Sequence, residues 1–297
     1  MDNQAAARDF VDWMRRKREA PPTTLDTYRR TVTAWADFLP ASLADRTSDD
    51  VEAFTARPRG RGVTEARPAT IAREVATLGS FYRWGQARLG WPNNPAVLAA
   101  RPKVHNRNPR PVDDATWLQV WTADLPVDAR VALGLGFYCG LRRREITALH
   151  GNQYWGGALV NFIRKGGGED RFDVADMLAH WQVKAPHLQP LRLTEPLERL
   201  ARLRGDLALM PWAPWSSPKA LNVRMYSWLD DCGLGSAAFT PHSLRHSFAT
   251  NLLRTGVPLD LACDLCNHSS PTITMRYIST GGGRLAALRQ PAIAEAL

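Results

Sequence analysis

Residues 240–256 read TPHSLRHSFATNLLRTG, and this stretch predicts one amphipathic helix together with both of its ends. Thr240 is suited to cap the helix, Pro241 fits its first position, and Gly256 is a typical stop. The apolar residues recur at helical spacing, so one face should be buried, with Leu244, Phe248 and Leu252 in a core. The helix is therefore expected inside a folded unit.

A second face of this helix carries His242 and Arg245, which are three residues apart and therefore neighbours. Both lie in the first turn, where free N–H groups and the helix dipole favour an anion. Such a His-x-x-Arg pair is weak evidence by itself, because an Arg-rich chain with 7 His should contain about one by chance. Its meaning depends on residues elsewhere in the chain.

An arginine with an acidic neighbour occurs earlier, in GLRRREITAL at residues 140–149. Arg142 and Glu145 are three residues apart, so on a helix the carboxylate is able to orient the guanidinium. A guanidinium stays charged and can contact two phosphate oxygens at once. The pair is a candidate phosphate site, and the alternative is a surface ion pair.

Tyr277 is the candidate nucleophile, although many tyrosines in such positions are core or interface residues. It follows residues 270–273, SPTI, which predict a short capped helix. A free phenol has a pKa near 10, so roughly one in a thousand is ionised at neutral pH. Attack on a phosphodiester therefore requires a nearby base and positive charge.

Four other residues are expected to meet that requirement around Tyr277. His242 would take the phenol proton, while Arg142 and Arg245 would stabilise the charge on a five-coordinate phosphorus. His268, nine residues before the tyrosine, would donate a hydrogen bond to the same phosphate. Together these groups predict attack on a DNA phosphate without a metal.

Residues 158–174 predict a β-hairpin in a chain that otherwise has mostly helical patterns. ALVNFI at 158–163 is rich in β-formers, RKGGGED forms a turn, and RFDV at 171–174 alternates. Lys165 then lies at the hairpin tip. It is a candidate general acid for the departing sugar oxygen, and the alternative is a solvated turn lysine.

Positive charge is concentrated in the first third of the chain. The formal net charge is +9, and residues 1–110 carry 19 Lys/Arg against 12 Asp/Glu. Such a distribution is expected if this part holds a phosphate backbone. The alternative is a solvated basic face and an ordinary linker. The candidate DNA contacts lie on two predicted helices and in RPKVHNRNPRPV: Arg29, Arg30, Arg73, Arg83, Arg101, Lys103, Arg107 and Arg110.

Composition argues against several other classes. Four cysteines are too few for a disulfide framework, and Cys263 and Cys266 have no second ligand pair, so we expect buried helix positions. A metal-dependent nuclease would need clustered carboxylates, and Glu145 is the one carboxylate among the candidate site residues. There is no signal-peptide pattern and no run of 18 apolar residues. We expect no metal, cofactor or membrane contact, and a cytoplasmic, nucleoid-associated protein.

With these motifs established, the chain resembles the tyrosine recombinases, the family of phage integrases and Xer-type recombinases, over nearly its whole length. The resemblance rests on GLRRRE, RKGGGEDR, PHSLRHSFATNLLRTG and LCNHSSPTITMRY. It implies that Glu145 supports the first arginine and that six residues are catalytic: Arg142, Lys165, His242, Arg245, His268 and Tyr277.

The resemblance also implies a mainly α fold in three parts. These are an all-α SAM-like core-binding domain at 1–100, a basic Pro-rich linker at 101–112, and an α+β catalytic domain with a small β-sheet and a tail at 113–297. The implied reaction cuts one strand at a time through a 3′-phosphotyrosyl link and exchanges strands through a Holliday junction. Its implied partners are double-stranded attachment sites, a homotetramer on DNA and an accessory factor, with neither metal nor ATP.

Two features depart from the family pattern. Asn267 stands where glycine is usual before the histidine, and asparagine also tolerates a left-handed backbone. The tail after Tyr277 departs from the Xer pattern and is expected to pack on a neighbouring subunit or in cis. The divergence of the tail from the Xer pattern favours an integrase of a phage or mobile element. The alternatives are a Xer-like dimer-resolution recombinase, a type IB topoisomerase and a non-catalytic DNA-binding regulator.

Overall fold

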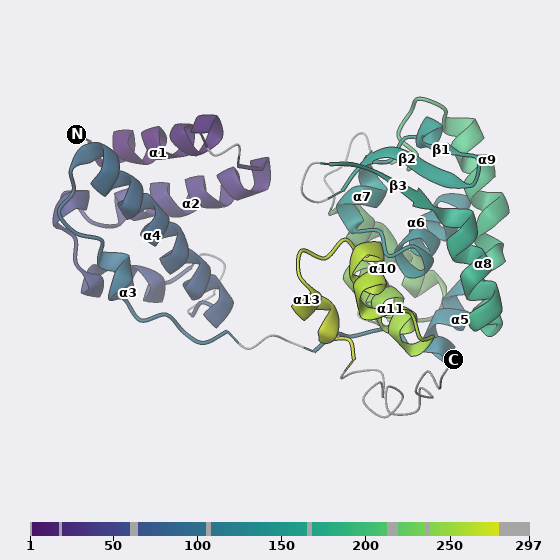
Figure 1. Cartoon of the computed structure of the whole chain (residues 1–297). Helices are drawn as coiled ribbons and strands as arrows, with labels where there is room; N and C mark the ends of the chain where they lie inside the picture. The colour runs from purple at the N-terminus through teal and green to yellow at the C-terminus, as the bar shows by residue number, and fades with distance from the viewer. Residues whose placement is uncertain are drawn as a thin grey trace, which may run out of the picture. The chain divides into compact units, whose positions relative to one another are not determined.

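The computed structural model describes residues 2–17, 20–59, 65–104, 108–164, 168–212, 219–235 and 238–278. The chain divides into two compact units, Met1–Asn106 and Arg107–Leu297, and each has its own hydrophobic core (Figure 1). The expectation of a mainly α fold with a small sheet is confirmed. Within those ranges, no helix has the length and apolar character needed to cross a membrane.

The first unit is built from helices around an aromatic core. Trp35 and Tyr82 are fully buried, and their polar atoms are paired: Trp35 Nε1 donates to Tyr82 Oη at 3.0 Å, which donates to the Leu43 carbonyl at 2.9 Å. Because a buried polar group is costly when unpaired, this chain of bonds fixes how the helices meet. The elements are α1 (Asn3–Lys17), α2 (Pro22–Phe38), η1 (Leu43–Asp45), α3 (Ser48–Ala56), α4 (Pro68–Leu89) and η2 (Pro95–Val97).

The second unit surrounds α6 (Val127–Tyr138), a helix that is apolar on nearly every side and largely buried. Helices α9 and α11 pack against it, which draws α11 into the interior. The other elements are α5 (Asp114–Thr122), α7 (Arg143–Ala148), η3 (Gly151–Gln153), α8 (Val174–Lys184), η4 (Pro186–Leu188), η5 (Pro190–Leu193), α9 (Thr194–Arg204), α10 (Ala220–Asp231), α11 (Pro241–Arg254), α12 (Leu259–Leu265) and α13 (Pro271–Met275).

A three-stranded antiparallel sheet lies at one edge of the second unit (Figure 1). Its strands are β1 (Tyr154–Trp155), β2 (Ala158–Ile163) and β3 (Glu169–Asp173). Leu159 on β2 pairs with Phe172 on β3, and both side chains are buried, so one face of the hairpin belongs to the core. The predicted hairpin is therefore present, whereas Lys165 in its turn lies outside the described residues.

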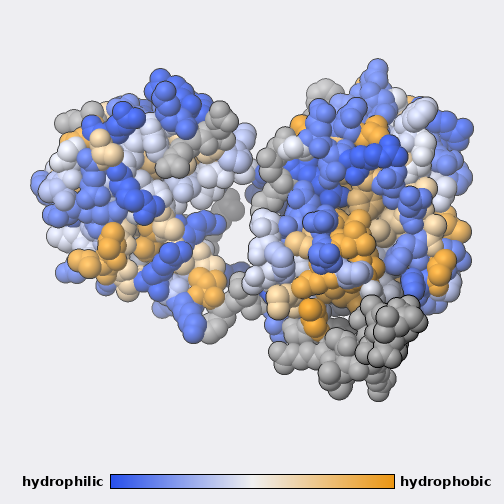
Figure 2. Space-filling view, viewed as in Figure 1, coloured by the Kyte–Doolittle hydropathy of each residue, from blue (hydrophilic) through white to orange (hydrophobic). Residues whose placement is uncertain are grey.

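The surface of the second unit is not uniformly polar. Figure 2 shows apolar surface in the region of α10 and α11, and the exposed apolar side chains include Val223 on α10, Leu261 on α12 and Met275 on α13. The polar side chains at the start of α11 are therefore set in a partly apolar surround, where charges interact more strongly than in water.

Candidate active site

The N-terminus of α11 has the predicted construction. Thr240 caps the helix: its Oγ1 accepts from the Ser243 backbone N–H at 3.3 Å, while Ser243 Oγ accepts from the Thr240 N–H at 3.2 Å. Pro241 begins the helix, and Gly256 follows its end with a φ of +86°. His242 and Arg245 are thereby fixed on the first turn, as the sequence indicated.

Among the predicted residues that the structure describes, Arg245 is the most buried, with 3% of its surface exposed. Its guanidinium donates to the backbone carbonyls of Gly140 and Cys266, which lie in segments far from α11 in sequence. Burial, with the nearby charge of Arg142, lowers the pKa of Arg245 to about 10. It therefore remains positively charged at neutral pH.

The position whose carbonyl accepts from Arg245 requires glycine, which is Gly140. Its φ is +64°, and a Cβ atom placed there would lie 2.2 Å from the Phe248 ring. An L-residue with a side chain would meet both backbone strain and a steric clash. Glycine thus lets this carbonyl approach the buried guanidinium.

Arg142 lies just before α7 in an extended conformation, with φ −74° and ψ 151°, and so is not inside a helix. Glu145 nevertheless holds it at two points: its carboxylate accepts from Arg142 Nη1 at 2.9 Å and from the Arg142 backbone N–H at 2.7 Å. The carboxylate is 4% exposed, so its position is fixed by packing. The predicted i, i+3 pair is formed, but as a helix-start contact.

The segment before His268 supports the other edge of the Arg142 guanidinium. Arg142 Nη2 donates to the Asn267 carbonyl at 2.7 Å, and Asn267 has a φ of +43°. The expectation that asparagine would adopt the left-handed conformation is confirmed. His268 Nδ1 lies 2.9 Å from Thr274 Oγ1, and burial together with Arg245 and Arg142 lowers the pKa of His268 to about 4. The imidazole is therefore neutral at neutral pH.

Arg164 completes a row of arginines along this segment, and it was missed from the sequence. It is 7% exposed, lies 3.0 Å from Asp170 Oδ2, and donates to the Leu265 carbonyl at 3.3 Å. Three successive carbonyls, those of Leu265, Cys266 and Asn267, therefore accept from Arg164, Arg245 and Arg142 in turn. We call this arrangement the carbonyl clamp.

Tyr277 follows α13 and is 5% exposed. Its ring stacks on His268 with centroids 5.9 Å apart and planes at 14°. Burial raises the pKa of Tyr277, while Arg245, Arg276 and Arg142 act in the opposite direction. The phenol is thus protonated at rest and surrounded by positive charge.

His246 contacts the Tyr277 hydroxyl, with His246 Nδ1 2.8 Å from Tyr277 Oη. The sequence interpretation assigned the role of taking the Tyr277 proton to His242. The His242 side chain is exposed, and its ring lies edge-on to His246 with centroids 4.2 Å apart. Although part of its side chain is open to solvent, desolvation by the surrounding protein, followed by the charge of Arg245, lowers the pKa of His242. The signal for His246 was available in HSLRH, because residues 242 and 246 are one helical turn apart.

The predicted basic residues of the first unit and the linker differ in their partners. Arg29 and Arg30 both pair with Asp26, at 2.9 and 2.7 Å, so part of their charge is neutralised. Arg73 and Arg83 are exposed on α4. Beyond the helices, the described linker residues Arg101, Lys103 and Arg110 are exposed, whereas Arg107 lies outside the described residues.

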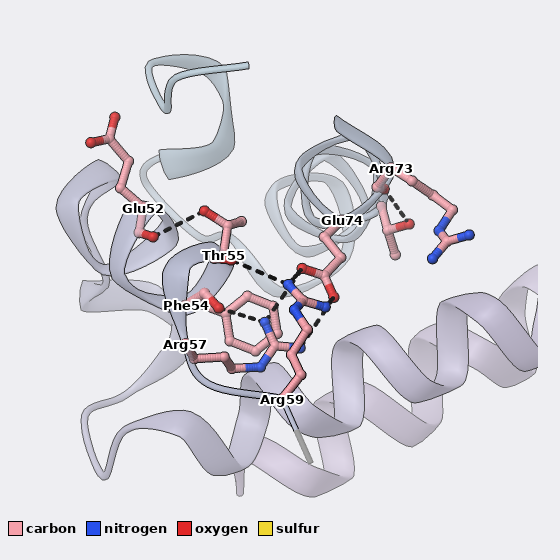
Figure 3. Close-up of polar contacts among 8 residues, drawn as sticks. Glu52, Phe54, Thr55, Arg57, Arg59, Arg73 and Glu74 are labelled. Atoms are coloured by element: carbon pink, nitrogen blue, oxygen red, sulfur yellow. Dashed lines mark hydrogen bonds and ion pairs between the residues drawn. The ribbon is translucent and has the colours of Figure 1, made fainter. Parts of the chain in front are cut away.

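A buried carboxylate on α4 collects two further arginines, which the sequence interpretation did not single out (Figure 3). Glu74 is 5% exposed and accepts from Arg57 Nη2 at 3.1 Å and from Arg59 Nη1 at 2.8 Å. Arg57 also lies over the Phe54 ring at 3.5 Å. In Figure 3 the Arg73 guanidinium points away from this cluster. Glu74 therefore joins the end of α3 to α4 and leaves Arg73 to solvent.

The cysteines are free, and Cys139, Cys263 and Cys266 are buried. The interpretation of Cys263 and Cys266 as buried positions is confirmed. Across the described ranges, the structure contains no group of three or more His, Cys, Asp or Glu residues arranged to hold a metal.

Comparison with known proteins agrees with this architecture. Residues 217–281 match the model of the phage integrase family, and residues 7–88 match its N-terminal SAM-like domain. The chain is 31% identical to tyrosine recombinase XerC of Rhodospirillum centenum over 98% of this chain and 87% of that protein. It is 27% identical to tyrosine recombinase XerD of Caulobacter vibrioides, covering 97% of this chain and 95% of that protein.

Solved structures share the fold at lower sequence identity. A lambda integrase (residues 75–356) dimer bound to a COC′ core site aligns with a TM-score of 0.69 at 18% identity, over 92% of this chain and 97% of that one. XerH recombinase bound to a palindromic difH substrate aligns at 0.61 and 16%, over 91% and 80%. With full-length relatives at this level of identity, the chain belongs to the tyrosine recombinase family, whose members break and rejoin DNA strands at specific sites.

Proposed function

We propose that this site-specific recombinase cuts DNA by attack of Tyr277 on a phosphodiester, forming a 3′-phosphotyrosyl link and releasing a 5′-hydroxyl. The single observation that carries the proposal is the position of the Tyr277 hydroxyl, which is buried beside Arg245 and Arg142 and bonded to an imidazole. The two arginines beside the phenol would offset the negative charge that a phosphate brings to the site.

The two arginines would hold the scissile phosphate. Backbone carbonyls and Glu145 fix the guanidinium planes of Arg142 and Arg245 before DNA arrives, so little reorganisation is needed on binding. His268, stacked on Tyr277, would donate a further hydrogen bond. Lys165 would protonate the leaving 5′ oxygen, a role that stays a prediction for a residue outside the described ranges.

The same chemistry supports strand exchange. The phosphotyrosyl bond retains the energy of the broken phosphodiester, so rejoining to a second strand requires neither ATP nor a metal. Exchange of two strands would give a Holliday junction within a tetramer, and a lambda integrase tetramer bound to such a junction shares the fold at a TM-score of 0.68. The basic residues of the first unit would hold the DNA backbone.

The DNA sites are proposed to be the attachment sites at which a phage or mobile element integrates and excises, with a host or phage accessory factor taking part. A second candidate is resolution of chromosome or plasmid dimers at the nucleoid. The full-length similarity to XerC and XerD proteins favours this second candidate. The sequence of the DNA that the enzyme cuts would decide between the two.

Covalent trapping tests the function. The protein is incubated with nicked duplexes whose central positions are randomised, and the DNA that stays attached in detergent is sequenced. Tyr277→Phe should abolish the attached band while retaining binding in a mobility-shift assay. A band that persists in Tyr277→Phe would contradict the nucleophile, and binding without any band in the wild type would support a regulator.

A further inference from the structure

We propose that His246 is the base that removes the proton from Tyr277 during attack on phosphorus, an assignment that rests on the function proposed above. The hydrogen bond between His246 Nδ1 and Tyr277 Oη, 2.8 Å long, is the observation behind it. A general base must lie within hydrogen-bond reach of the proton it removes, and His246 already does so without DNA.

The surroundings of the ring fix its protonation state. His242 and Arg245 face it from α11, and Arg276, Tyr277 and His268 face it from the segment that follows α12. Burial lowers the pKa of His246 to about 4, with His242, Arg276 and Arg245 acting in the same direction, so the ring is neutral at neutral pH. The proposal requires the tautomer that carries its proton on Nε2, which leaves Nδ1 free to accept from the phenol 2.8 Å away.

Binding of DNA would make His246 a stronger base. The phosphate adds a negative charge beside Arg245 and Arg142, which offsets the cations that depress basicity. The phenol also becomes more acidic as its oxygen bonds to phosphorus. Both changes bring the proton affinities of the His246 ring and the Tyr277 oxygen closer together at the moment when the proton must be transferred.

The step balances in atoms and charge. The Tyr277 O–H proton moves to His246 Nδ1, the phenol oxygen bonds to phosphorus, and the P–O5′ bond breaks with its electron pair on the 5′ oxygen. That oxygen takes a proton from an acid, for which Lys165 is the predicted donor. In rejoining, the protonated His246 returns its proton to the departing Tyr277 oxygen.

The main test compares two variants in the trapping assay. His246→Gln keeps a hydrogen-bond acceptor but does not take a proton, so the rate of covalent attachment should fall by about 10²- to 10⁴-fold. Its rate should then rise in proportion to hydroxide, whereas the wild-type rate should level off near neutrality. His187→Gln, on the exposed η4 turn, is the matched control and should keep the wild-type rate.

Two further measurements keep the outcome decisive if His246→Gln folds poorly. Added imidazole should restore attachment by His246→Ala. In the DNA-free protein, nitrogen NMR of His246 should show the proton on Nε2, and Tyr277→Phe should shift the Nδ1 signal. A proton on Nδ1 would overturn the assignment, and so would wild-type or faster attachment by His246→Gln, which would mean that the ring merely holds the tyrosine.

These results separate the two proposals. If the wild type forms no covalent complex that Tyr277→Phe removes, the proposed function fails. If that complex forms at the same rate in His246→Gln, the function stands and the base is another group, with His242 the next to test.

Discussion

Arg142 Nη2 donates to the Asn267 carbonyl at 2.7 Å, joining residues that are 125 positions apart in sequence. The bond depends on the left-handed backbone of Asn267, which turns that carbonyl toward the guanidinium. A residue in the loop before His268 therefore helps to set the position of an arginine on another element.

Asn267→Val should weaken this contact. A β-branched residue at φ +43° carries strain of about 1–2 kcal/mol, and relief of the strain would move the carbonyl away from Arg142. We expect a lower thermal midpoint and slower covalent attachment to DNA. Asn267→Gly removes the strain and should match the wild type in both assays. Equal thermal midpoints and attachment rates for Asn267→Val and Asn267→Gly would contradict the conclusion that the left-handed backbone at residue 267 positions Arg142.

Gly140→Ala should be far more harmful than a similar change at another left-handed glycine. Its new Cβ would meet the Phe248 ring, so we expect a loss of about 3 kcal/mol from overpacking and backbone strain together. Gly256 also has a positive φ, +86°, but an added Cβ would meet no atom within 4 Å, so Gly256→Ala should lower the free energy of unfolding by about 1 kcal/mol. Urea unfolding of both variants measures the difference, and similar losses would show that the ring moves aside.

Arg164→Met should slow catalysis. It removes the donor to the Leu265 carbonyl, which frees the segment leading to His268, and small misplacements of catalytic groups can cost about 10- to 100-fold in rate. Arg171→Met is the matched control, because Arg171 pairs on the exposed side of the hairpin with Asp173 at 2.6 Å. Rates of covalent attachment should fall for the first variant and not for the second.

Glu74 should make the first unit sensitive to acid. Burial raises its pKa, but hydrogen bonds from Arg59 and Arg57 outweigh burial and hold the pKa below the ordinary 4.5. The carboxylate therefore stabilises the fold fully above about pH 4.5, and this contribution is lost as the pH falls through its lowered pKa.

Glu74→Gln tests that effect. Removing one partner of a buried ion pair should destabilise the first unit by about 3 kcal/mol at neutral pH, and the variant should lose less stability than the wild type on further acidification. Glu65→Gln, at an exposed position, is the control. Calorimetry at several pH values is the measurement, and parallel pH profiles for wild type and Glu74→Gln would contradict the prediction.

Patterns within one element were readable from the sequence. The cap at Thr240, the stop at Gly256 and the strand at 158–163 follow from local propensity and spacing, and all three are present. Asn267 could be placed in the left-handed region because few residue types tolerate it.

Contacts between elements were harder to predict. His246 was missed because its partner, Tyr277, is 31 residues away, and tertiary packing decides which of two histidines on one turn reaches it. Arg164 and the carbonyl clamp were missed for a different reason: backbone acceptors have no sequence signature. The start of α7 after Arg142 is a local boundary that the apolar pattern did not reveal.

The carbonyl clamp also has an electrostatic consequence. Arg142, Arg164 and Arg245 would repel one another if nothing offset their charges, and the clamp places them at the C-terminal end of α12, where the helix dipole is negative. This end acts as a counter-ion built of peptide groups. Because it carries no full charge, it adds to the support that Glu145 gives Arg142 and Asp170 gives Arg164, and it cancels less of their attraction for a phosphate than a further carboxylate would.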